Sequence, residues 1–287
     1  MIKNRKKFIV LTVLAVILVG LIGWTVWGNT ALELNQYTLR SEKLPESFSG
    51  YRIAQVSDLH NTELGKGNDR LLEVLREAKP DIITITGDLI DSRNTNVETA
   101  LEFAREAVKI APCYYVTGNH EARVPAEYSK LKKGLVELGV AILENERITL
   151  EKNGQTVILM GVDDPSLQTD YLFGDAESAM KAQLQTLMRE KNAYTVLLSH
   201  RPELFDVYAE NGVDLILSGH AHGGQFRLPF IGGLAAPNQG LFPEYDGGLY
   251  TNNGTNMIVS RGVGNSIVPF RFNNRPEVVL VELIYCP

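Results

Sequence analysis

The 287-residue chain has little cysteine, and this excludes two classes of protein. Cys113 and Cys286 are too few for a disulfide scaffold or a cysteine-rich zinc module. An excess of basic residues is also missing, since 28 Lys and Arg stand against 34 Asp and Glu, for a net charge of −6. Because a nucleic-acid-binding surface neutralises phosphates with Lys and Arg, we expect no nucleic-acid partner. The hydrophobic share of 44% is typical of a globular chain with a sizeable core.

Acidic residues are missing from residues 1–30, which hold four basic residues and a long apolar run. Phe8–Trp27 contains 20 residues without a charge. At 1.5 Å per residue this run spans about 30 Å, the thickness of the hydrocarbon core of a bilayer. The basic residues predict a cytoplasmic N-terminus, with Trp24 and Trp27 at the far interface and the rest of the chain outside the cytoplasm. These basic residues are Lys3, Arg5, Lys6 and Lys7.

Two other interpretations of this segment are a buried helix of a soluble domain and a cleaved signal peptide. A buried helix is disfavoured because globular helices are rarely apolar all round. Signal cleavage requires small residues at positions −3 and −1, and the best site, Asn29-Thr30-Ala31, has Asn at −3. We therefore expect an uncleaved, single-pass anchor over residues 1–30 in the cell membrane and one extracytoplasmic domain over residues 31–287.

The body of the chain has no internal repeat and no long polar linker after residue 50. It alternates helical periods with short apolar runs rich in Val, Ile, Thr and Tyr, which predicts an α/β domain whose strands are covered on both faces. The predicted strands are Leu34–Leu39, Arg52–Ser57, Asp81–Thr86, Cys113–Thr117, Thr156–Met160, Tyr194–Ser199, Val213–Ser218, Met257–Ser260 and Val278–Ile284. The predicted helices are Asp69–Ala78, Val97–Ile110, Pro125–Leu138 and Ala176–Glu190.

Five of the predicted strands end in side chains that commonly bind metal ions. All five histidines of the chain lie in these endings, whereas histidines placed by chance would be scattered. In open α/β sheets, ligands bind outside the carboxyl ends of the strands, so we expect these side chains to meet at one site. They are Asp58, His60, Asp88, Asn119, His120, His200, His220 and His222.

The residue types at these strand ends indicate which ion the site prefers. Carboxylates, imidazoles and an amide oxygen occur without a thiolate, a set that suits Mn, Fe or Zn and disfavours Ca and Mg. The ligands suffice for two divalent transition-metal ions, and we favour Mn. Paired metals about 3.5–4 Å apart activate water and hold both oxygens of an in-line displacement at phosphorus. The pattern therefore predicts phosphoryl chemistry.

In chain order, the motifs are Asp-x-His, Gly-Asp-x-x-Asp, Gly-Asn-His-Glu, a single His and Gly-His-x-His. This order resembles that of the calcineurin-like metallophosphoesterases, over about residues 50–284. Ser218–Gln225, which reads SGHAHGGQ, together with Arg271-Phe272 and Arg275–Glu277, resembles the membrane-associated bacterial branch of that family. The resemblance implies a four-layer α-β-β-α sandwich, with two packed mixed β-sheets between outer helices.

The resemblance also implies a role for each residue of the site. His120 would donate a proton to the leaving-group oxygen or contact the phosphate. Asp91 would orient the His120 imidazole and raise its pKa, with a turn or helix cap as the alternative for Asp91. Glu121 would support the site structurally. The first metal is assigned to Asp58, His60 and His222, the second to Asn119, His200 and His220, and the bridge between the two to Asp88.

The chain departs from the family's phosphoprotein phosphatases at two positions. Those enzymes carry Arg directly after the second Asp of the Gly-Asp motif and directly after Asn-His-Glu. Here Ser92 and Ala122 occupy these positions, with Arg93 and Arg123 one residue later. Without this arginine pair, a phosphoprotein is disfavoured as the substrate.

Gly223–Gly248 follows the last predicted ligand and combines many glycines with apolar side chains. This segment is either a packed loop or an apolar lip that meets a lipid or the membrane surface. Asp163-Asp164 ends another strand, where a turn is the default expectation and a place at the rim of the site is the alternative.

These observations predict a membrane-anchored dinuclear-metal phosphohydrolase. It would cleave a phosphoester, phosphodiester or pyrophosphate bond by direct attack of metal-bound hydroxide, on a lipid or lipid-linked substrate. The alternatives are a phosphodiesterase for soluble or cell-wall phosphates and a non-catalytic metal-binding scaffold, which would have lost ligands. A metallo-β-lactamase-type hydrolase would show His-x-His-x-Asp-His, and the sequence contains no such string. No protein partner is implied.

Overall fold

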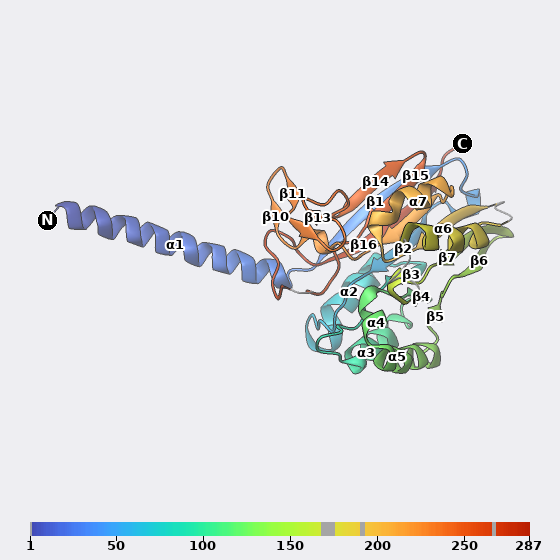
Figure 1. Ribbon diagram of the computed structural model, residues 1–287, viewed down its shortest axis with the longest axis horizontal. Coiled ribbons are helices and arrows are strands. Elements are labelled where there is room, and N and C mark those ends of the chain that lie inside the picture. Colours follow the sequence, from blue (N-terminus) through green and yellow to red (C-terminus); the bar gives the residue numbers. More distant parts are fainter. Residues whose placement is uncertain (1, 168–175, 190–192, 266–267) are drawn as a thin grey trace.

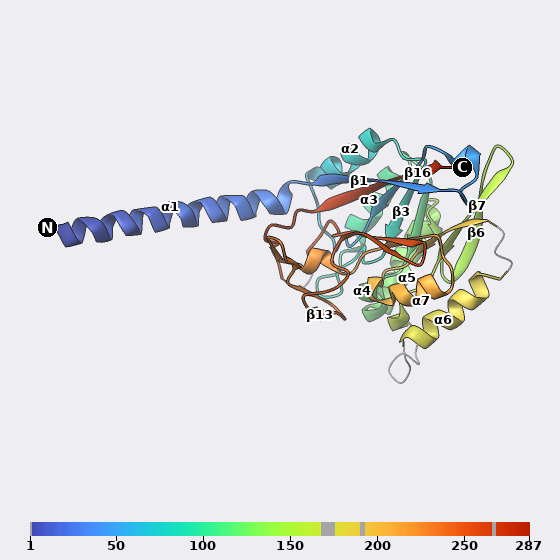
Figure 2. The same ribbon diagram turned by 90° about the horizontal axis from the view of Figure 1, so that it is seen from above.

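The computed structural model describes residues 2–167, 176–189, 193–265 and 268–287. An N-terminal helix, α1 (Ile2–Thr30), projects from a domain formed by the rest of the chain (Figure 1). Among the described residues, α1 is the one helix long and apolar enough to cross a membrane, and none of its apolar window is buried. The C-terminus lies at the end of the domain farthest from α1 (Figures 1 and 2).

Two six-stranded mixed sheets form the centre of the domain. In the first, the strand order is β1-β16-β2-β3-β4-β5, and β2 to β5 run parallel to one another. These strands are β1 (Glu33–Ser41), β2 (Tyr51–Val56), β3 (Ile82–Thr86), β4 (Cys113–Val116), β5 (Ala141–Ile142) and β16 (Glu277–Tyr285).

The second sheet has the strand order β14-β15-β9-β8-β7-β6, with a parallel centre and antiparallel edge strands. Its strands are β6 (Glu146–Lys152), β7 (Gln155–Gly161), β8 (Tyr194–Leu198), β9 (Leu215–Ser218), β14 (Gly248–Asn252) and β15 (Thr255–Val259). Two small hairpins follow β9 and lie outside both sheets. They are formed by β10 (Arg227–Leu228) with β11 (Gly232–Gly233), and by β12 (Ala235–Ala236) with β13 (Gly240–Leu241).

Helices cover the outer face of each sheet. α2, α3 and α5 pack on the first sheet, for example through Leu75, Phe103 and Leu131, while α6 and α7 pack on the second. Asn96 caps α3 by accepting a hydrogen bond from the Glu98 N–H, and Pro125 occupies the first turn of α5. The helices are α2 (Asp69–Ala78), α3 (Val97–Ala107), α4 (Asn119–Arg123), α5 (Pro125–Glu137), α6 (Ala176–Leu187) and α7 (Phe205–Glu210), with short 3₁₀ turns at Glu46–Phe48, Lys66–Asn68, Pro165–Leu167, Pro202–Leu204 and His222–Gly224.

The core consists of three apolar clusters: one lies between each sheet and its helices, and the third fills the space between the two sheets. Ile53 of β2 and Val196 of β8 belong to it, whereas the neighbouring Ala54 and Leu197 face the outer helices. This alternation shows that the central strands are covered on both faces, as their continuous apolarity predicted. The layers are therefore helix, sheet, sheet and helix, and the predicted four-layer α/β sandwich is confirmed.

The central strands lie where the sequence predicts them, but several peripheral elements were not predicted. The edge strands β6 and β14 alternate between exposed and partly buried residues, and β5 and the hairpin strands have two residues each. The predicted helix Val97–Ile110 ends earlier, at Ala107. The helix predicted over Ala176–Glu190 ends at Leu187, and Glu190 lies outside the described residues.

Candidate active site

The carboxyl ends of five strands meet at one edge of the two sheets and bring together side chains that are distant in sequence. β2, β3 and β4 supply residues from the first sheet, and β8 and β9 supply residues from the second. Five of the predicted site residues have a left-handed backbone, which is uncommon for residues other than glycine and clusters at functional sites. Their φ angles are 53° at Asp58, 46° at His60, 52° at Asp88, 67° at His220 and 49° at His222.

Glycines precede two of these loops because the neighbouring carboxylates leave no room for a side chain. A Cβ atom at Gly118 would overlap the carboxylate of Asp88, and a Cβ atom at Gly219 would overlap Ser57 and Asp58. These contacts give a physical reason for Gly in the Gly-Asn-His-Glu and Gly-His-x-His motifs.

One group of side chains consists of Asp58, His60 and His222, all buried. The Nε2 atoms of His60 and His222 lie 3.2 Å apart, and Asp58 Oδ1 is 3.3 Å from His222 Nε2. Burial lowers the pKa of His222 to about 3 and outweighs the charge of Asp58, which acts in the opposite direction.

A second group consists of Asp88, His200 and His220, also buried. His200 Nε2 lies 3.2 Å from both His220 Nδ1 and Asp88 Oδ2. Burial lowers the pKa of His200, but the charge of Asp88 outweighs this effect and raises the pKa to about 10. Asp88 Oδ2 is also 3.6 Å from His60 Nε2, so one carboxylate faces both groups.

These contacts fit metal ions better than they fit hydrogen bonds alone. Two nitrogens bound to one divalent ion at about 2.0–2.1 Å lie roughly 3.0–3.4 Å apart, which matches both pairs of histidines. Asn119 Oδ1 is buried without a hydrogen-bond partner, and the same holds for Nδ1 of His60 and of His222. Buried polar atoms are almost always paired, so the free amide oxygen of Asn119 fits the ligand role predicted for it.

The site also agrees with what comparison with known proteins finds. Residues 51–224 match the family model of the calcineurin-like phosphoesterases. The chain belongs to this family. It is 30% identical over 261 residues to the metallophosphoesterase YkuE of Bacillus subtilis, a match that covers 88% of this chain and 85% of YkuE. The phosphodiesterase YaeI of Escherichia coli is 28% identical, with 82% of each chain covered.

Two further comparisons concern the anchor and the fold of this phosphoesterase. A zebrafish protein described as a transmembrane protein with a metallophosphoesterase domain is 29% identical, over 84% of this chain and 55% of its own length. Together with α1, this likeness supports membrane association. The crystal structure of TT1561 from Thermus thermophilus shares the fold, with a TM-score of 0.52 at 12% identity, over 75% of this chain and 91% of that chain. The phosphoesterase is thus a metal-dependent enzyme that acts on phosphate esters.

The environment of His120 in the phosphoesterase differs from the prediction. Asp91 Oδ1 is 3.8 Å from His120 Nδ1, too far for a hydrogen bond. His120 Nδ1 instead accepts the Ser92 N–H at 3.0 Å, and the carboxylate of Asp91 binds the Arg93 guanidinium at 2.6 and 3.1 Å. Burial lowers the pKa of His120 to about 4 and outweighs the charges of Asp88 and Asp91, which act in the opposite direction. The ring is neutral and carries its proton on Nε2.

Asp91 has a place in the loop after β3 that fits the alternative interpretation of a turn residue. Its Oδ1 atom accepts the Arg93 N–H at 2.8 Å, and its carbonyl oxygen accepts the Thr95 hydroxyl at 2.9 Å. Asp91 Oδ2 also lies 3.9 Å from His60 Nδ1. Asp91 therefore holds the loop that carries Ser92, and it reaches His120 through that residue.

Glu121 of the phosphoesterase joins two of the loops that carry site residues. Its buried carboxylate accepts backbone N–H groups from Gly118 at 2.8 Å, from Asp88 at 3.0 Å and from Ile90 at 3.2 Å. Burial and the neighbouring charge of Asp88 raise the pKa of Glu121 to about 7. Glu121 thus fixes the loop after β3 against the start of α4, in agreement with the expected structural role.

Replacing Glu121 with Gln is expected to loosen both loops because one of the three N–H groups would face an amide NH₂. We expect a loss of about 1–3 kcal/mol in the free energy of unfolding. Metal affinity should fall roughly 10–100-fold because the loops orient ligands. Chemical denaturation and metal titration measure the two effects. Glu127→Gln, on the exposed face of α5 in an ion pair with Lys130, is the control and should change neither quantity measurably. Unchanged stability and metal affinity in Glu121→Gln would contradict this role.

Two residues of the phosphoesterase that the sequence did not point to also lie at the site, the buried Arg201 and the exposed Asn238. Arg201 follows His200 directly and places Nη1 3.2 Å from His220 Nε2, while its Nη2 donates to Asp164 Oδ1 at 2.9 Å. Asn238 Oδ1, from the second hairpin, also lies 3.2 Å from His220 Nε2. Both side chains contact Nε2 of His220, so its Nδ1 atom is the one that faces His200. The position of Arg201 next to a predicted ligand was a usable signal, whereas Asn238 had none.

Proposed function

We propose that this phosphoesterase is a membrane-anchored hydrolase with two divalent transition-metal ions, Mn before Fe or Zn. The observation that carries the proposal is the pair of buried side-chain groups joined by Asp88, which faces both. When bound, the ions supply positive charge to the phosphoryl oxygens and acidify a water molecule for in-line attack. The residues proposed for the first ion are Asp58, His60 and His222, those for the second are Asn119, His200 and His220, and Asp88 contributes to both.

His120 is proposed to act on the leaving group. Its Nδ1 atom accepts the Ser92 N–H, which fixes the ring and leaves the Nε2–H as a donor. The His60 and His120 rings lie 4.5 Å apart, which puts this donor next to the first group of ligands. As the P–O bond to the leaving group breaks and a bond forms from water to phosphorus, the Nε2–H of His120 donates a hydrogen bond to the departing oxygen and stabilises its developing negative charge, while the proton lost by the attacking water passes to solvent. Asp91 and Ser92 position the imidazole.

The proposed substrate carries an apolar group beside its phosphate. A cavity of about 370 Å³ lies next to the metal-binding groups, and almost all of its lining is apolar. A lipid tail fits this surface, so we propose a phospholipid or a lipid-linked phosphodiester or pyrophosphate over a soluble or cell-wall phosphate. The lining residues are Ala221, His222, Gly224, Gln225, Phe226, Leu234, Ala235, Ala236, Pro237 and Val268.

Filling this cavity tests the substrate class. Ala235→Phe is expected to lower kcat/KM on a long-chain phospholipid roughly 10–100-fold, because the added ring takes the place of the tail. Activity on p-nitrophenyl phosphate should remain within about twofold, since that ester uses the metal site without the cavity. Ala235→Ser keeps the size of the side chain and is the matched control. Equal losses on both substrates would indicate damage to the fold, and no loss on either would leave the cavity without a role in lipid binding.

The proposed topology places the catalytic domain outside the cytoplasm. The basic residues before the apolar span of α1 favour a cytoplasmic N-terminus, and Trp24 and Trp27 lie at the other end of the helix. Protease added to intact cells or spheroplasts is expected to degrade the domain while a cytoplasmic marker protein stays intact. A domain that is cut only after lysis would place it in the cytoplasm and overturn this orientation.

A further inference from the structure

Exposed apolar side chains gather at one end of the domain. Outside α1, the described residues include seven exposed large hydrophobic side chains. Four of these belong to the two small hairpins and their turns, and we call them the tip cluster: Phe230, Ile231, Leu241 and Phe242. A fifth, Phe270, packs its ring 5.3 Å from that of Phe226 at the base of the first hairpin. Such a concentration of exposed apolar side chains on neighbouring hairpins marks an interaction surface.

The hairpins are joined to the end of α1 through the segment at residues 270–272. Arg227 N–H donates to the Phe272 carbonyl at 3.0 Å. Between these phenylalanines, the backbone of Arg271 exchanges two hydrogen bonds with the Asn29 side chain, at 2.7 and 2.8 Å. Both ribbon views accordingly show the hairpins at the end of the domain from which α1 projects (Figures 1 and 2).

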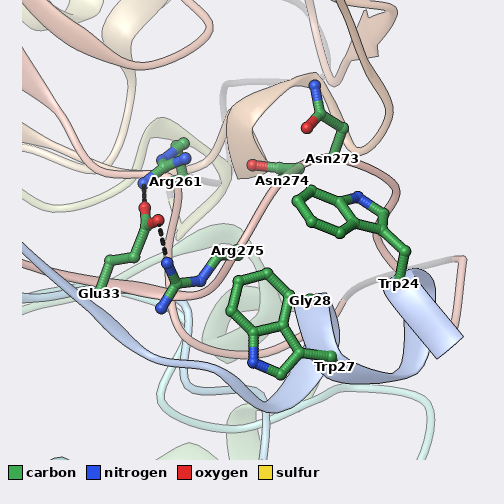
Figure 3. Close-up of a pocket in the computed structure, with 8 residues that line it drawn as sticks. All are labelled: Trp24, Trp27, Gly28, Glu33, Arg261, Asn273, Asn274 and Arg275. Carbon is green, nitrogen blue, oxygen red and sulfur yellow. Dashed lines mark hydrogen bonds and ion pairs between the residues drawn. The ribbon is translucent and has the colours of Figure 1, made fainter.

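Further contacts fix the direction of α1 relative to the domain (Figure 3). Glu33, which follows the helix closely, accepts hydrogen bonds from Arg261 and Arg275, each at 2.6 Å. The Arg275 guanidinium lies 4.7 Å from the centre of the Trp27 ring, and its Nε–H donates to the Ala31 carbonyl at 2.7 Å. The helix is therefore held to the domain by side-chain contacts as well as by the chain itself.

We infer that the tip cluster inserts into the interface of the same lipid bilayer that holds α1, as a second membrane contact of the domain. The partner is lipid because the cluster is apolar, aromatic in part and carried by hairpins at the end of the domain from which the anchor projects. The second hairpin also forms one wall of the apolar cavity, because Leu234, Ala235 and Ala236 line that cavity. Phe242 is tied to this wall, since its N–H donates to the Leu234 carbonyl. The second contact therefore brings this cavity to the membrane surface.

The test uses the full chain in nanodiscs of phosphatidylcholine and phosphatidylglycerol, with an environment-sensitive fluorophore on single cysteines. Cys286→Ser removes the exposed native thiol, while Cys113 is buried. Phe230→Cys and Phe242→Cys report on the tip cluster, and Val16→Cys reports on α1. Val136→Cys is the matched control on α5, because Val136 is 58% exposed and Phe242 is 59% exposed.

Labels at 230 and 242 are expected to show blue-shifted emission, loss of quenching by aqueous iodide and gain of quenching by spin-labelled lipid, as at 16. The label at 136 should stay open to iodide. If 230 and 242 behave like 136 while 16 is shielded, the second contact is absent and the anchor stands. If the label at 16 is also open, the anchor itself has failed. Shielding at 230 and 242 from iodide without quenching by lipid would indicate a protein contact and overturn the inference. None of these readouts depends on catalysis.

Discussion

Asp88→Asn is expected to cause the largest loss of activity of any single substitution at the metal-binding groups. Asp88 Oδ2 faces His200 at 3.2 Å and His60 at 3.6 Å, so its charge serves both groups. Removing one negative charge shared by two divalent ions should cost several kcal/mol of transition-state stabilisation, or roughly 10³-fold in kcat/KM. Elemental analysis of the full-length enzyme should find about two metal ions per chain, and clearly fewer in the variant.

The asparagine at this position is expected to leave the fold intact. Asp88 Oδ1 accepts the backbone N–H of His120 at 2.8 Å, and the amide oxygen of an asparagine can accept the same hydrogen bond. Asp81→Asn is a matched control, because Asp81 precedes the opposite end of β3 and accepts the Arg52 N–H there. It should retain metal and activity. A native-like metal content and rate in Asp88→Asn would show that Asp88 does not join two ions, and a wild-type chain that takes up no metal would refute the site.

His120→Ala is expected to keep its metal but to lose roughly 10²–10³-fold in kcat, the range for removal of a hydrogen-bond donor to developing negative charge. The loss should shrink for p-nitrophenyl esters, whose leaving group needs less stabilisation of its charge. Steady-state kinetics on a series of aryl phosphates with leaving groups of increasing pKa measures this dependence, which a structural role of His120 would not produce.

The alanine variant also leaves the Ser92 N–H without an acceptor inside the protein. His120→Asn separates this effect from catalysis, because an amide oxygen near the position of Nδ1 can accept the same N–H. The asparagine variant should therefore recover stability without recovering the rate. Loss of metal together with activity in both variants would make His120 a ligand and refute its assignment to the leaving group.

The central part of the fold could be predicted because its strands carry an unmistakable pattern. Runs such as Tyr194–Leu198 are fully buried in the structure. A strand that is covered on both faces is apolar along nearly its whole length, and this makes it easy to recognise in the sequence. The edge strand β6 reads ERITLEK and is mostly exposed, so it resembles a loop or a helix as much as a strand. The two-residue strands of the hairpins are set by contacts distant in sequence, such as the bridge between Phe226 and Phe272.

That the side chains of the two buried groups meet could be predicted because each lies within four residues of the end of a strand, and parallel strand ends share one edge of a sheet. The hydrogen-bond partner of the His120 ring could not be predicted, because the choice between Asp91 and Ser92 depends on which of them points at the ring. Arg93 competes for the carboxylate of Asp91, and the backbone of Ser92 then takes the imidazole. Asn238 reaches His220 from the end of a hairpin that carries no local pattern, so only the three-dimensional structure reveals it.

The meeting of two sheets at the ligands has a consequence for the life of the protein in the cell. In the proposed assignment, each ion takes ligands from both sheets: Asp58 and His222 at one, Asp88 and His200 at the other. Bound metal therefore acts as a cross-link between halves of the core that are assembled from distant parts of the chain. Because ions that bind only the folded state stabilise it by mass action, the folded population rises with free metal concentration. Metal starvation would then remove the enzyme by proteolysis as well as by loss of turnover, and the supply of metal would set its abundance.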